Sequence, residues 1–406
     1  MKSVLFMMAC VATPVWGQEG GMTLADAVAR ARTHAPLVAI ASGRRMIAQG
    51  RARYDGAFPN PTLEWRRENL NSPLQPDIFT QLQLPLDVTG RRLAIRAAGA
   101  QLTARGRADS AATVRQQESD VVRSYWRAAL GAELLSIARD EREGRERVAD
   151  FDGTRFKEGA VAEVVAMRTR LETDRARITE ASARGEAARA GADLARALGM
   201  HPDSLPTLAR VPLLTRLTAP PDESTAWRRA ESERPDLAAF RHAAAEAERR
   251  AAAERRGVVA DLQLVTGYKQ TAGFTTGLVG VIVPLPLFSR NEGPRQRTQG
   301  EWLVANAELR DAEHRVRGEV SAAIRAYSAM RDAVASGAAG IDVQATEVAQ
   351  IAEAAYRERA TSLIELVEAQ RARAESRAAA LRWMIEIHLA VLELNRAVGA
   401  PLLEMP

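Results

Sequence analysis

Long stretches without proline constrain this chain more than any other feature of its sequence. No proline occurs between Pro85 and Pro202, and a second proline-free stretch covers residues 295–400. Apolar residues recur there at helical spacing, one series being Val121, Val122, Tyr125, Ala128 and Ala129. We therefore predict a helix over about residues 92–157, which would be roughly 95–100 Å long. A helix of that length needs equally long neighbours, as in a coiled coil or a bundle.

The two proline-free stretches lie in two copies of one sequence plan. Residues 156–160 resemble residues 356–360, 200 positions later, and residues 194–199 resemble residues 394–399 at the same offset. Two further matches occur in the same order, with offsets between 199 and 201. We therefore predict a tandem duplication, with a first repeat over residues 18–210 and a second over residues 211–406.

Each copy also carries a pair of short segments in which polar and apolar residues alternate. These pairs lie within about residues 61–87 and about residues 261–287. Alternation at period two puts one set of side chains on each face of a sheet. The predicted fold is mainly α-helical with a small β part, made of tandem-duplicated long helical hairpins and four strands.

The first residues predict the compartment. Lys2 precedes a short apolar stretch over residues 4–15 that contains no acidic residue, and small or aliphatic residues stand at positions 15 and 17. We interpret residues 1–17 as a secretory signal peptide cleaved after Gly17. The alternative is lipidation of Cys10, the single cysteine of the chain. Either interpretation places the mature protein outside the cytoplasm.

Composition and charge argue against several classes of function. No run of 18 apolar residues occurs, which excludes a transmembrane helix. The net charge is +5, but acidic residues are interleaved with the arginines, which is typical of a solvated helix face and not of a nucleic-acid-binding surface. The 5 histidines lack metal-ligand spacing, and no glycine-rich phosphate loop follows a strand. We expect no enzyme activity, no cofactor, no metal site and no nucleic-acid partner.

Four strands in a secreted chain need partners for their edges. Exposed edges are a liability in water and are excluded within a bilayer, so strands that span an outer membrane must close into a barrel. A barrel needs at least eight strands and one chain would supply four, which makes oligomerisation obligatory. Two copies would supply eight strands and three would supply twelve, and the sequence spacing does not choose between them.

The helical pattern breaks at residues 158–160 and at residues 359–362, which is the same place in both copies. We interpret each break as the tip of a helical hairpin, with Gly159 supplying a left-handed turn conformation. The alternative is an uninterrupted helix that carries a tolerated glycine.

Several motifs, taken in order, resemble the TolC-like family of outer-membrane efflux proteins. The resemblance covers both copies and rests on residues 23–28 with Ala35 and Pro36, residues 59–63, Pro284-Leu285-Pro286-Leu287-Phe288 with residues 290–293, and residues 356–370. Within that family, residues 88–92 and 284–288 are most similar to the cobalt–zinc–cadmium efflux type.

The resemblance implies a homotrimer. Its twelve-stranded barrel would sit in outer-membrane lipid and continue as an α-helical tunnel into the periplasm of a Gram-negative bacterium. The tunnel would dock onto a periplasmic membrane-fusion adaptor and, through it, onto an inner-membrane pump of the resistance-nodulation-division type. The protein would be the passive exit duct of this tripartite efflux system, with heavy-metal cations as cargo. Two other functions stay open: a periplasmic helical-hairpin adaptor or structural protein, and an outer-membrane duct for type I protein secretion.

The resemblance also implies two groups of site residues. The adaptor would dock on the small residues of the tips, which are Gly159, Ala160, Val161, Ala360, Thr361 and Ser362. Glu365 and Glu368 match an acidic ring at the periplasmic gate, and their spacing of three puts them on one helix face. The simpler alternatives are that the tip residues only form turns and that the glutamates pair with Arg371 or Arg373.

Two departures from the family pattern affect the tips. Arg359 stands where the family usually has glycine, so we expect the second turn to differ in shape from the first. Residues 167–169 (Met-Arg-Thr) replace a more acidic or smaller pattern, which leaves the gate chemistry of the first tip open.

Overall fold

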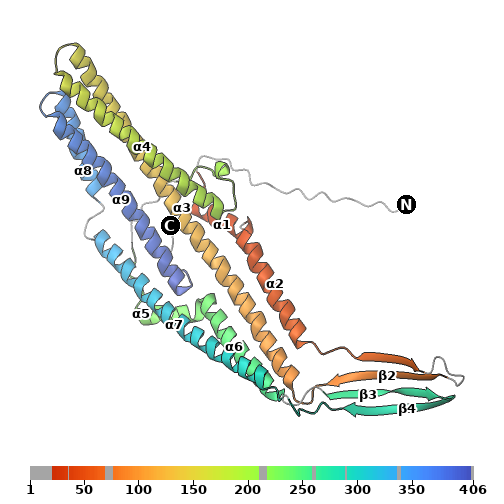
Figure 1. Cartoon of the computed structure of the whole chain (residues 1–406). Coiled ribbons are helices and arrows are strands. Elements are labelled where there is room, and N and C mark those ends of the chain that lie inside the picture. Colours follow the sequence, from red (N-terminus) through yellow and green to blue (C-terminus); the bar gives the residue numbers. More distant parts are fainter. Residues whose placement is uncertain are drawn as a thin grey trace, which may run out of the picture.

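The computed structural model describes residues 21–34, 36–68, 76–209, 217–257, 262–288, 290–335 and 340–403. Over these ranges the chain is an elongated rod of helices with a four-stranded sheet at one end and two helical hairpins at the other (Figure 1). The predicted signal peptide and Cys10 lie outside the described residues.

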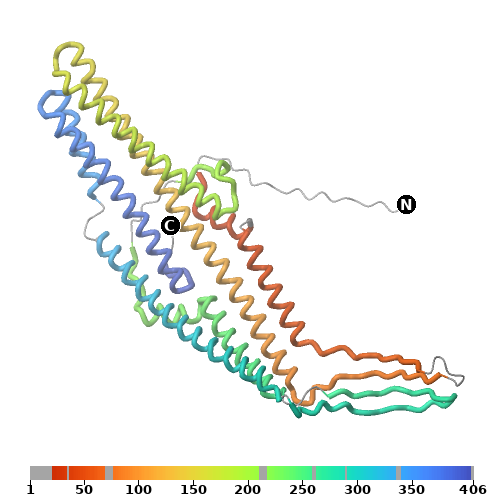
Figure 2. The backbone as a smooth tube through the Cα atoms, viewed as in Figure 1, coloured from red at the N-terminus to blue at the C-terminus, as the bar shows by residue number. Residues whose placement is uncertain are grey.

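The rod is built on one helix, α3 (Arg91–Lys157), which runs for 67 residues from the sheet to the first hairpin tip (Figure 2). At 1.5 Å per residue its length is about 100 Å. The half near the sheet packs against α2 (Pro36–Gly56) and α6 (Pro235–Arg256), and the half near the tip packs against α4 (Glu163–Ala197). The predicted long helix and its need for long neighbours are confirmed.

The same order of elements occurs twice among the described residues. The first half contains α1 (Leu24–His34), α2, two strands, α3 and α4, and it ends at the short 3-10 helix η1 (Pro202–Ser204). The second half contains α5 (Glu223–Glu233), α6, two strands, α7 (Glu292–Ala335), α8 (Ile341–Arg357) and α9 (Leu363–Val398). Two helices, α7 and α8, therefore stand where the first half has α3. The mainly helical fold is confirmed, and the repeat boundaries stay a prediction.

The four strands form one antiparallel sheet in the order β1-β2-β3-β4. Their bounds are β1 (Thr62–Glu68), β2 (Asp77–Leu86), β3 (Leu262–Thr271) and β4 (Phe274–Ile282). Ala272 and Gly273 join β3 to β4 with φ of 50° and 87°, as a tight two-residue hairpin turn requires. Both predicted strand pairs are confirmed.

Four helices continue the sheet in the order of its strands, and we call α2, α3, α6 and α7 the helix wall. α2 leads into β1, α3 follows β2, α6 leads into β3, and α7 follows β4. Neighbours in the wall contact each other in that same order. The close approach of α2 to α3 requires glycine, because a Cβ at Gly106 would lie only 2.7 Å from the Cβ of Ala48.

Large buried side chains gather near the middle of the rod, where the two halves meet. Tyr125 and Trp126 of α3 share one cluster with Ile385 and Leu392 of α9. The Trp126 ring stacks on His388 with centroids 4.0 Å apart. Elsewhere the helices bury mostly alanine. None of the helices in the described ranges is apolar over a length sufficient to cross a membrane.

Arg234, between α5 and α6, is a buried cation that links three helices. Its guanidinium donates to the carboxylate of Asp236 at 3.0 and 2.6 Å and to Glu319 of α7 at 2.7 Å. It also donates to the carbonyl oxygen of Ala397 in α9 at 3.1 Å. Gly399, with φ of 75°, makes room for it, because a Cβ there would lie 2.7 Å from the Cγ of Arg234.

We expect Arg234→Gln to lower the free energy of unfolding by about 3 kcal/mol. Removing one partner of a buried ion pair leaves the other charge uncompensated, and the loss sits at the low end of the usual range because Asp236 is 40% exposed. Urea denaturation followed by circular dichroism measures the change. Arg229→Gln, on the exposed surface of α5, is the matched control and should change stability by less than about 0.5 kcal/mol. Equal losses in the two variants would contradict the linking role of Arg234.

Candidate functional site

The sheet has one mainly apolar face and one mostly polar face. The register puts a first set of side chains on the mainly apolar face: Leu63, Trp65, Leu82, Leu84, Leu264, Tyr268, Val279 and Val281, with Arg67, Thr80, Thr266, Gln270 and Thr275 among them. The opposite face carries Thr62, Glu64, Arg66, Gln81, Gln83, Gln263 and Lys269, with Phe79, Val265 and Leu278 among them. Such a sheet can separate an apolar phase from water.

The polar side chains of the sheet contact one another across neighbouring strands. The Glu64 carboxylate accepts hydrogen bonds from the side-chain amides of Gln81 at 2.5 Å and Gln83 at 3.3 Å. The Phe79 ring lies between two cations, Arg66 and Lys269, each 4.8 Å from its centroid. These contacts stabilise the polar side chains on one face of a sheet whose opposite face is mainly apolar.

Each outer strand has one free edge in the described part of the chain. β1 pairs with β2 alone and β4 pairs with β3 alone. The outer helices of the wall also expose apolar side chains, with Ile47 and Tyr54 of α2 being 71% and 84% exposed and Leu303 of α7 being 56% exposed. Open space surrounds the glycines nearby, which are Gly43, Gly50 and Gly300.

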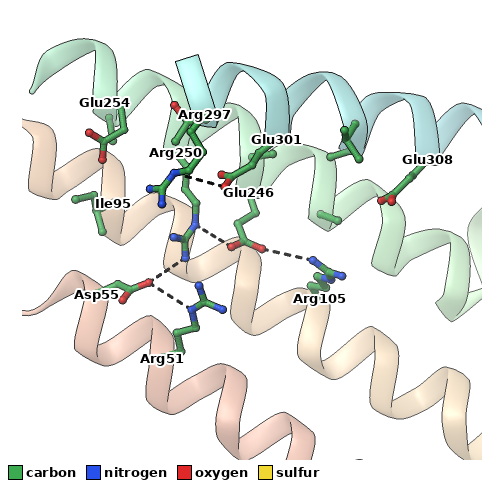
Figure 3. Close-up of a pocket in the computed structure, with 16 residues that line it drawn as sticks. Arg51, Asp55, Ile95, Arg105, Glu246, Arg250, Glu254, Arg297, Glu301 and Glu308 are labelled. Carbon is green, nitrogen blue, oxygen red and sulfur yellow. Dashed lines mark hydrogen bonds and ion pairs between the residues drawn. The ribbon is translucent and has the colours of Figure 1, made fainter. Parts of the chain in front are cut away.

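A charged groove of about 630 Å³ lies along the helix wall, and we call it the inner groove (Figure 3). Residues of all four wall helices line it, so it occupies the concave side of the wall. Ion pairs of alternating sign cross it: Asp55 to Arg250 at 2.9 Å, Arg250 to Glu246 at 2.9 Å, and Glu246 to Arg105 at 3.9 Å (Figure 3). These contacts join α2, α3 and α6.

The two hairpin tips have the same backbone geometry. The N–H of Ala160 donates to the carbonyl of Arg155 at 2.8 Å, and the N–H of Ala360 donates to that of Ala355 at 2.8 Å. This is the hydrogen bond of a helix that ends in a left-handed residue. The predicted breaks at both tips are confirmed.

The expectation that Arg359 changes the shape of the second turn is wrong. Arg359 has φ of 64°, close to the 74° of Gly159. The hydrogen bonds of the turn hold the arginine in the left-handed region, which costs about 1–2 kcal/mol for a residue with a Cβ. Sequence reasoning missed this because local hydrogen bonding outweighs the steric preference of one residue.

The predicted docking residues all lie at the tips. Gly159, Ala160, Ala360 and Ser362 are exposed, and Val161 and Thr361 are half-exposed. Ser362 also has a structural role, since its Oγ accepts from the N–H of Glu365 at 3.3 Å and caps α9. Their docking role stays a prediction.

The predicted gate residues lie in the first two turns of α9. The Glu365 carboxylate accepts hydrogen bonds from the hydroxyl of Thr361 and from the N–H of Ser362, and these bonds lower its pKa. Glu368 is exposed. The pKa of Arg371 is raised mainly by the hydrogen bond that Arg371 makes to Glu375 and, to a smaller extent, by the charge of Glu368. Glu365 is therefore tied to the helix cap, and the gate role of both glutamates stays a prediction.

A buried contact that the sequence patterns do not predict joins the two hairpins near their tips. The hydroxyl of Tyr356 in α8 donates to the carboxylate of Asp152 in α3, with oxygen–oxygen distances of 3.0 and 2.8 Å. Asp152 is fully buried and is also paired with Arg155 at 3.4 Å. The sequence does contain one signal for this contact. The repeat offset aligns Tyr356 with Phe156, and the additional hydroxyl of a buried tyrosine needs a hydrogen-bond partner.

The environment of Tyr356 keeps its hydroxyl protonated at neutral pH. Burial, followed by the hydrogen bond to Asp152 and the charge of that carboxylate, raises the pKa of Tyr356 to about 12. The hydroxyl is thus a donor to a buried carboxylate, which is the stronger class of hydrogen bond. No group of three or more His, Cys, Asp or Glu side chains placed to hold a metal ion occurs in the described ranges.

Comparison with known sequences gives one short similarity. No family model matches the chain. Protein CyaE of Bordetella pertussis is 33% identical over 127 residues, which is 31% of this chain and 27% of that protein. The match therefore spans about a quarter of the length of this curated relative.

Solved structures show the fold over nearly the whole chain. The outer membrane protein VceC of Vibrio cholerae has a TM-score of 0.78 at 18% identity, covering 93% of this chain and 96% of VceC. The Campylobacter jejuni CmeC outer membrane channel has a TM-score of 0.80 at 15% identity, covering 96% and 91%. CusC, whose structures concern transmembrane channel formation, has a TM-score of 0.77 at 18% identity, covering 95% and 96%. The chain therefore shares the fold of outer-membrane channels.

We expect Tyr356→Phe to loosen the contact between the hairpins. The variant removes a hydrogen bond to a charged group and leaves a buried carboxylate less satisfied, a loss of about 1.5–3 kcal/mol. Hydrogen–deuterium exchange should become faster at residues 150–157 and 352–358 and stay unchanged in the sheet. Tyr327→Phe, which removes the 2.9 Å bond to the carbonyl of Thr218, is the matched control and should act near the middle of the rod. Unchanged exchange at the tips would show that the Asp152 contact does not hold the hairpins together.

Proposed function

We propose that the chain is the outer-membrane exit duct of a tripartite efflux system in a Gram-negative bacterium. Three copies would form a twelve-stranded barrel that continues as a helical tunnel into the periplasm. The duct is passive, and an inner-membrane pump of the resistance-nodulation-division type drives transport through a periplasmic membrane-fusion adaptor.

One observation carries this proposal: an amphipathic four-stranded sheet with two free edges runs directly into a helix wall of the same order. A sheet with an apolar face is stable in lipid only if its edges are paired, and closure needs at least eight strands. If β1 of one copy pairs with β4 of the next, the strands would close into a barrel. The same pairing would bring α2 of one copy beside α7 of the next. The exposed apolar residues and open glycines of these helices suit that contact.

A soluble adaptor or structural protein fits this sheet less well. In a small soluble domain the apolar side of a sheet is covered by another layer. Here Leu63 and Trp65 are 68% and 64% exposed, and Val279 is 78% exposed. An uncovered apolar face with aromatic residues is typical of strands in contact with lipid.

Acidic residues near the periplasmic end support heavy-metal cations as the cargo class. Three copies would place three Glu365 and three Glu368 around one axis, and rings of carboxylates favour cations in pores. A duct that released its cargo readily would hold no tight metal site. We therefore assign Glu365 and Glu368 a weak attractive role at the gate.

Planar-bilayer recordings of the purified full-length chain test both the duct and its gate. The wild-type protein should run as a detergent-resistant oligomer and give discrete, cation-selective channels. Glu365→Gln with Glu368→Gln should keep the channels and reduce the K⁺ over Cl⁻ permeability ratio by about half, because uncharged side chains attract cations less. Asp342→Asn with Glu347→Gln, two acidic residues in the first two turns of α8 and therefore farther from the tip, is the matched control.

The outcomes separate the two assignments. A water-soluble monomer that forms no channels would refute the duct. Channels whose selectivity is the same in both double variants would leave the duct intact and remove the gate role of the glutamates.

We also propose that the small residues of the tips dock the adaptor. Because the mature chain would carry no cysteine, single cysteines at Ala160 and Thr361 can be cross-linked without background. We expect efficient cross-links to the cognate adaptor in cells from both positions and none from a cysteine at Gly300, which lies far from the tips. Absence of cross-links at both positions would contradict the docking assignment.

A further inference from the structure

A second groove, of about 450 Å³, lies between α2 and α3 close to the sheet, and we call it the outer groove. Small residues, including Gly56 and Gly99, form its floor. Arg53, Arg96 and Arg107 line it, and none of its described lining residues is acidic. It is a cationic surface, whereas the inner groove is lined by both acidic and basic residues.

The outer groove faces away from the inner groove. On α2 the inner groove is lined by Arg51 and the outer groove by Arg53, and on α3 the corresponding residues are Arg105 and Arg107. Two residues along a helix correspond to a rotation of about 200°. The inner groove touches all four wall helices from the concave side, so the outer groove opens on the convex side. In a closed ring of copies this is the outside of the tunnel.

The arginines of the outer groove are available to a ligand. Among the residues that the structure describes, no ion pair involves Arg53, Arg96 or Arg107. By contrast, Arg105 and Arg250 of the inner groove are held by carboxylates of their own chain. A positive surface without internal counter-charges is complementary to an external anion.

Exposed apolar residues lie between this cationic surface and the sheet. Phe58, four positions before β1, is 53% exposed and has the Arg96 guanidinium 5.8 Å from its ring centroid. Leu93, in the first turn of α3, is 64% exposed. Going from the sheet along the helices, exposed apolar side chains come first, with the Arg92 guanidinium 5.9 Å from the Phe58 ring centroid among them, and the three arginines of the groove follow. A bilayer leaflet presents acyl chains and then phosphate groups in that same order.

We propose that the outer groove binds the phosphate group of an anionic phospholipid in the leaflet on the helix side. This inference rests on the proposed function, because it requires β1 to β4 to lie in a bilayer. Arg53 and Arg96 bind the phosphate oxygens, for which the guanidinium geometry is suited. Phe58 and Leu93 contact the upper part of the acyl chains. Arg107, about 16 Å farther along α3 than Arg96, extends the attractive potential.

Native mass spectrometry of the full-length oligomer in detergent tests the assignment, with dioleoylphosphatidylglycerol and dioleoylphosphatidylcholine as probes. Wild type should retain phosphatidylglycerol preferentially, and added NaCl should weaken that preference because charge drives it. Arg53→Gln with Arg96→Gln should lower phosphatidylglycerol affinity by about tenfold. Arg168→Gln with Arg189→Gln, two exposed arginines of α4, makes the same charge change and should leave the affinity unchanged.

Each result has a defined meaning. Equal affinity of wild type for the two lipids, or equal loss in the two double variants, would overturn the inference. Displacement of phosphatidylglycerol by inorganic phosphate beyond that caused by NaCl at the same ionic strength would also overturn it, because the groove would then be a site for free anions. Channel recordings on the same samples keep the two proposals apart: channels without lipid preference refute the headgroup site alone, whereas absence of channels refutes the duct and this inference together.

Discussion

Unpaired backbone groups along β1 and β4 are the constraint on which the rest of the structure depends. A strand edge needs partners for its N–H and C=O groups, and within lipid this need is absolute. The helix wall repeats the strand order, so whatever pairs the sheet edges also covers α2 and α7. The exposed Ile47, Tyr54 and Leu303 lie on these two helices. The proposed pairing of one copy against the next would therefore satisfy the hydrogen bonds of the sheet edges and also cover the apolar surfaces of the wall.

Much of this architecture could be predicted from the sequence, because it depends on periodicity. The absence of proline placed the long helix within one residue of α3, which begins at Arg91 and ends at Lys157. Alternation of polar and apolar residues placed both strand pairs. The break in pattern at the same position of both copies placed the two tips. Each of these signals depends on residues close together in the sequence and repeats along the chain. It can therefore be detected without knowing the tertiary contacts.

Contacts between distant segments could not be predicted in the same way. The contacts of Arg234 with Glu319 and Ala397 depend on how α7 and α9 cross it, and no local sequence pattern predicts them. The bond between Asp152 and Tyr356 joins residues 204 positions apart. The positive φ of Arg359 shows the same limit at short range, because the hydrogen bonds around it decide its conformation. Sequence patterns describe faces of helices and strands, whereas these contacts depend on which faces meet.

Packing is graded along the rod, and this gradient bears on how the proposed duct would open. Near the middle, Trp126, Tyr327 and Ile385 are almost fully buried, and each such side chain contributes about 1.5–3 kcal/mol. Toward the tips, α3 and α4 bury small or polar residues such as Ala166 and Thr169, which contribute much less. Polar contacts hold the hairpins together there. Local opening follows local packing, so the tips can separate while the middle stays folded. The proposed duct would need this property to open when the proposed adaptor docks at its tips.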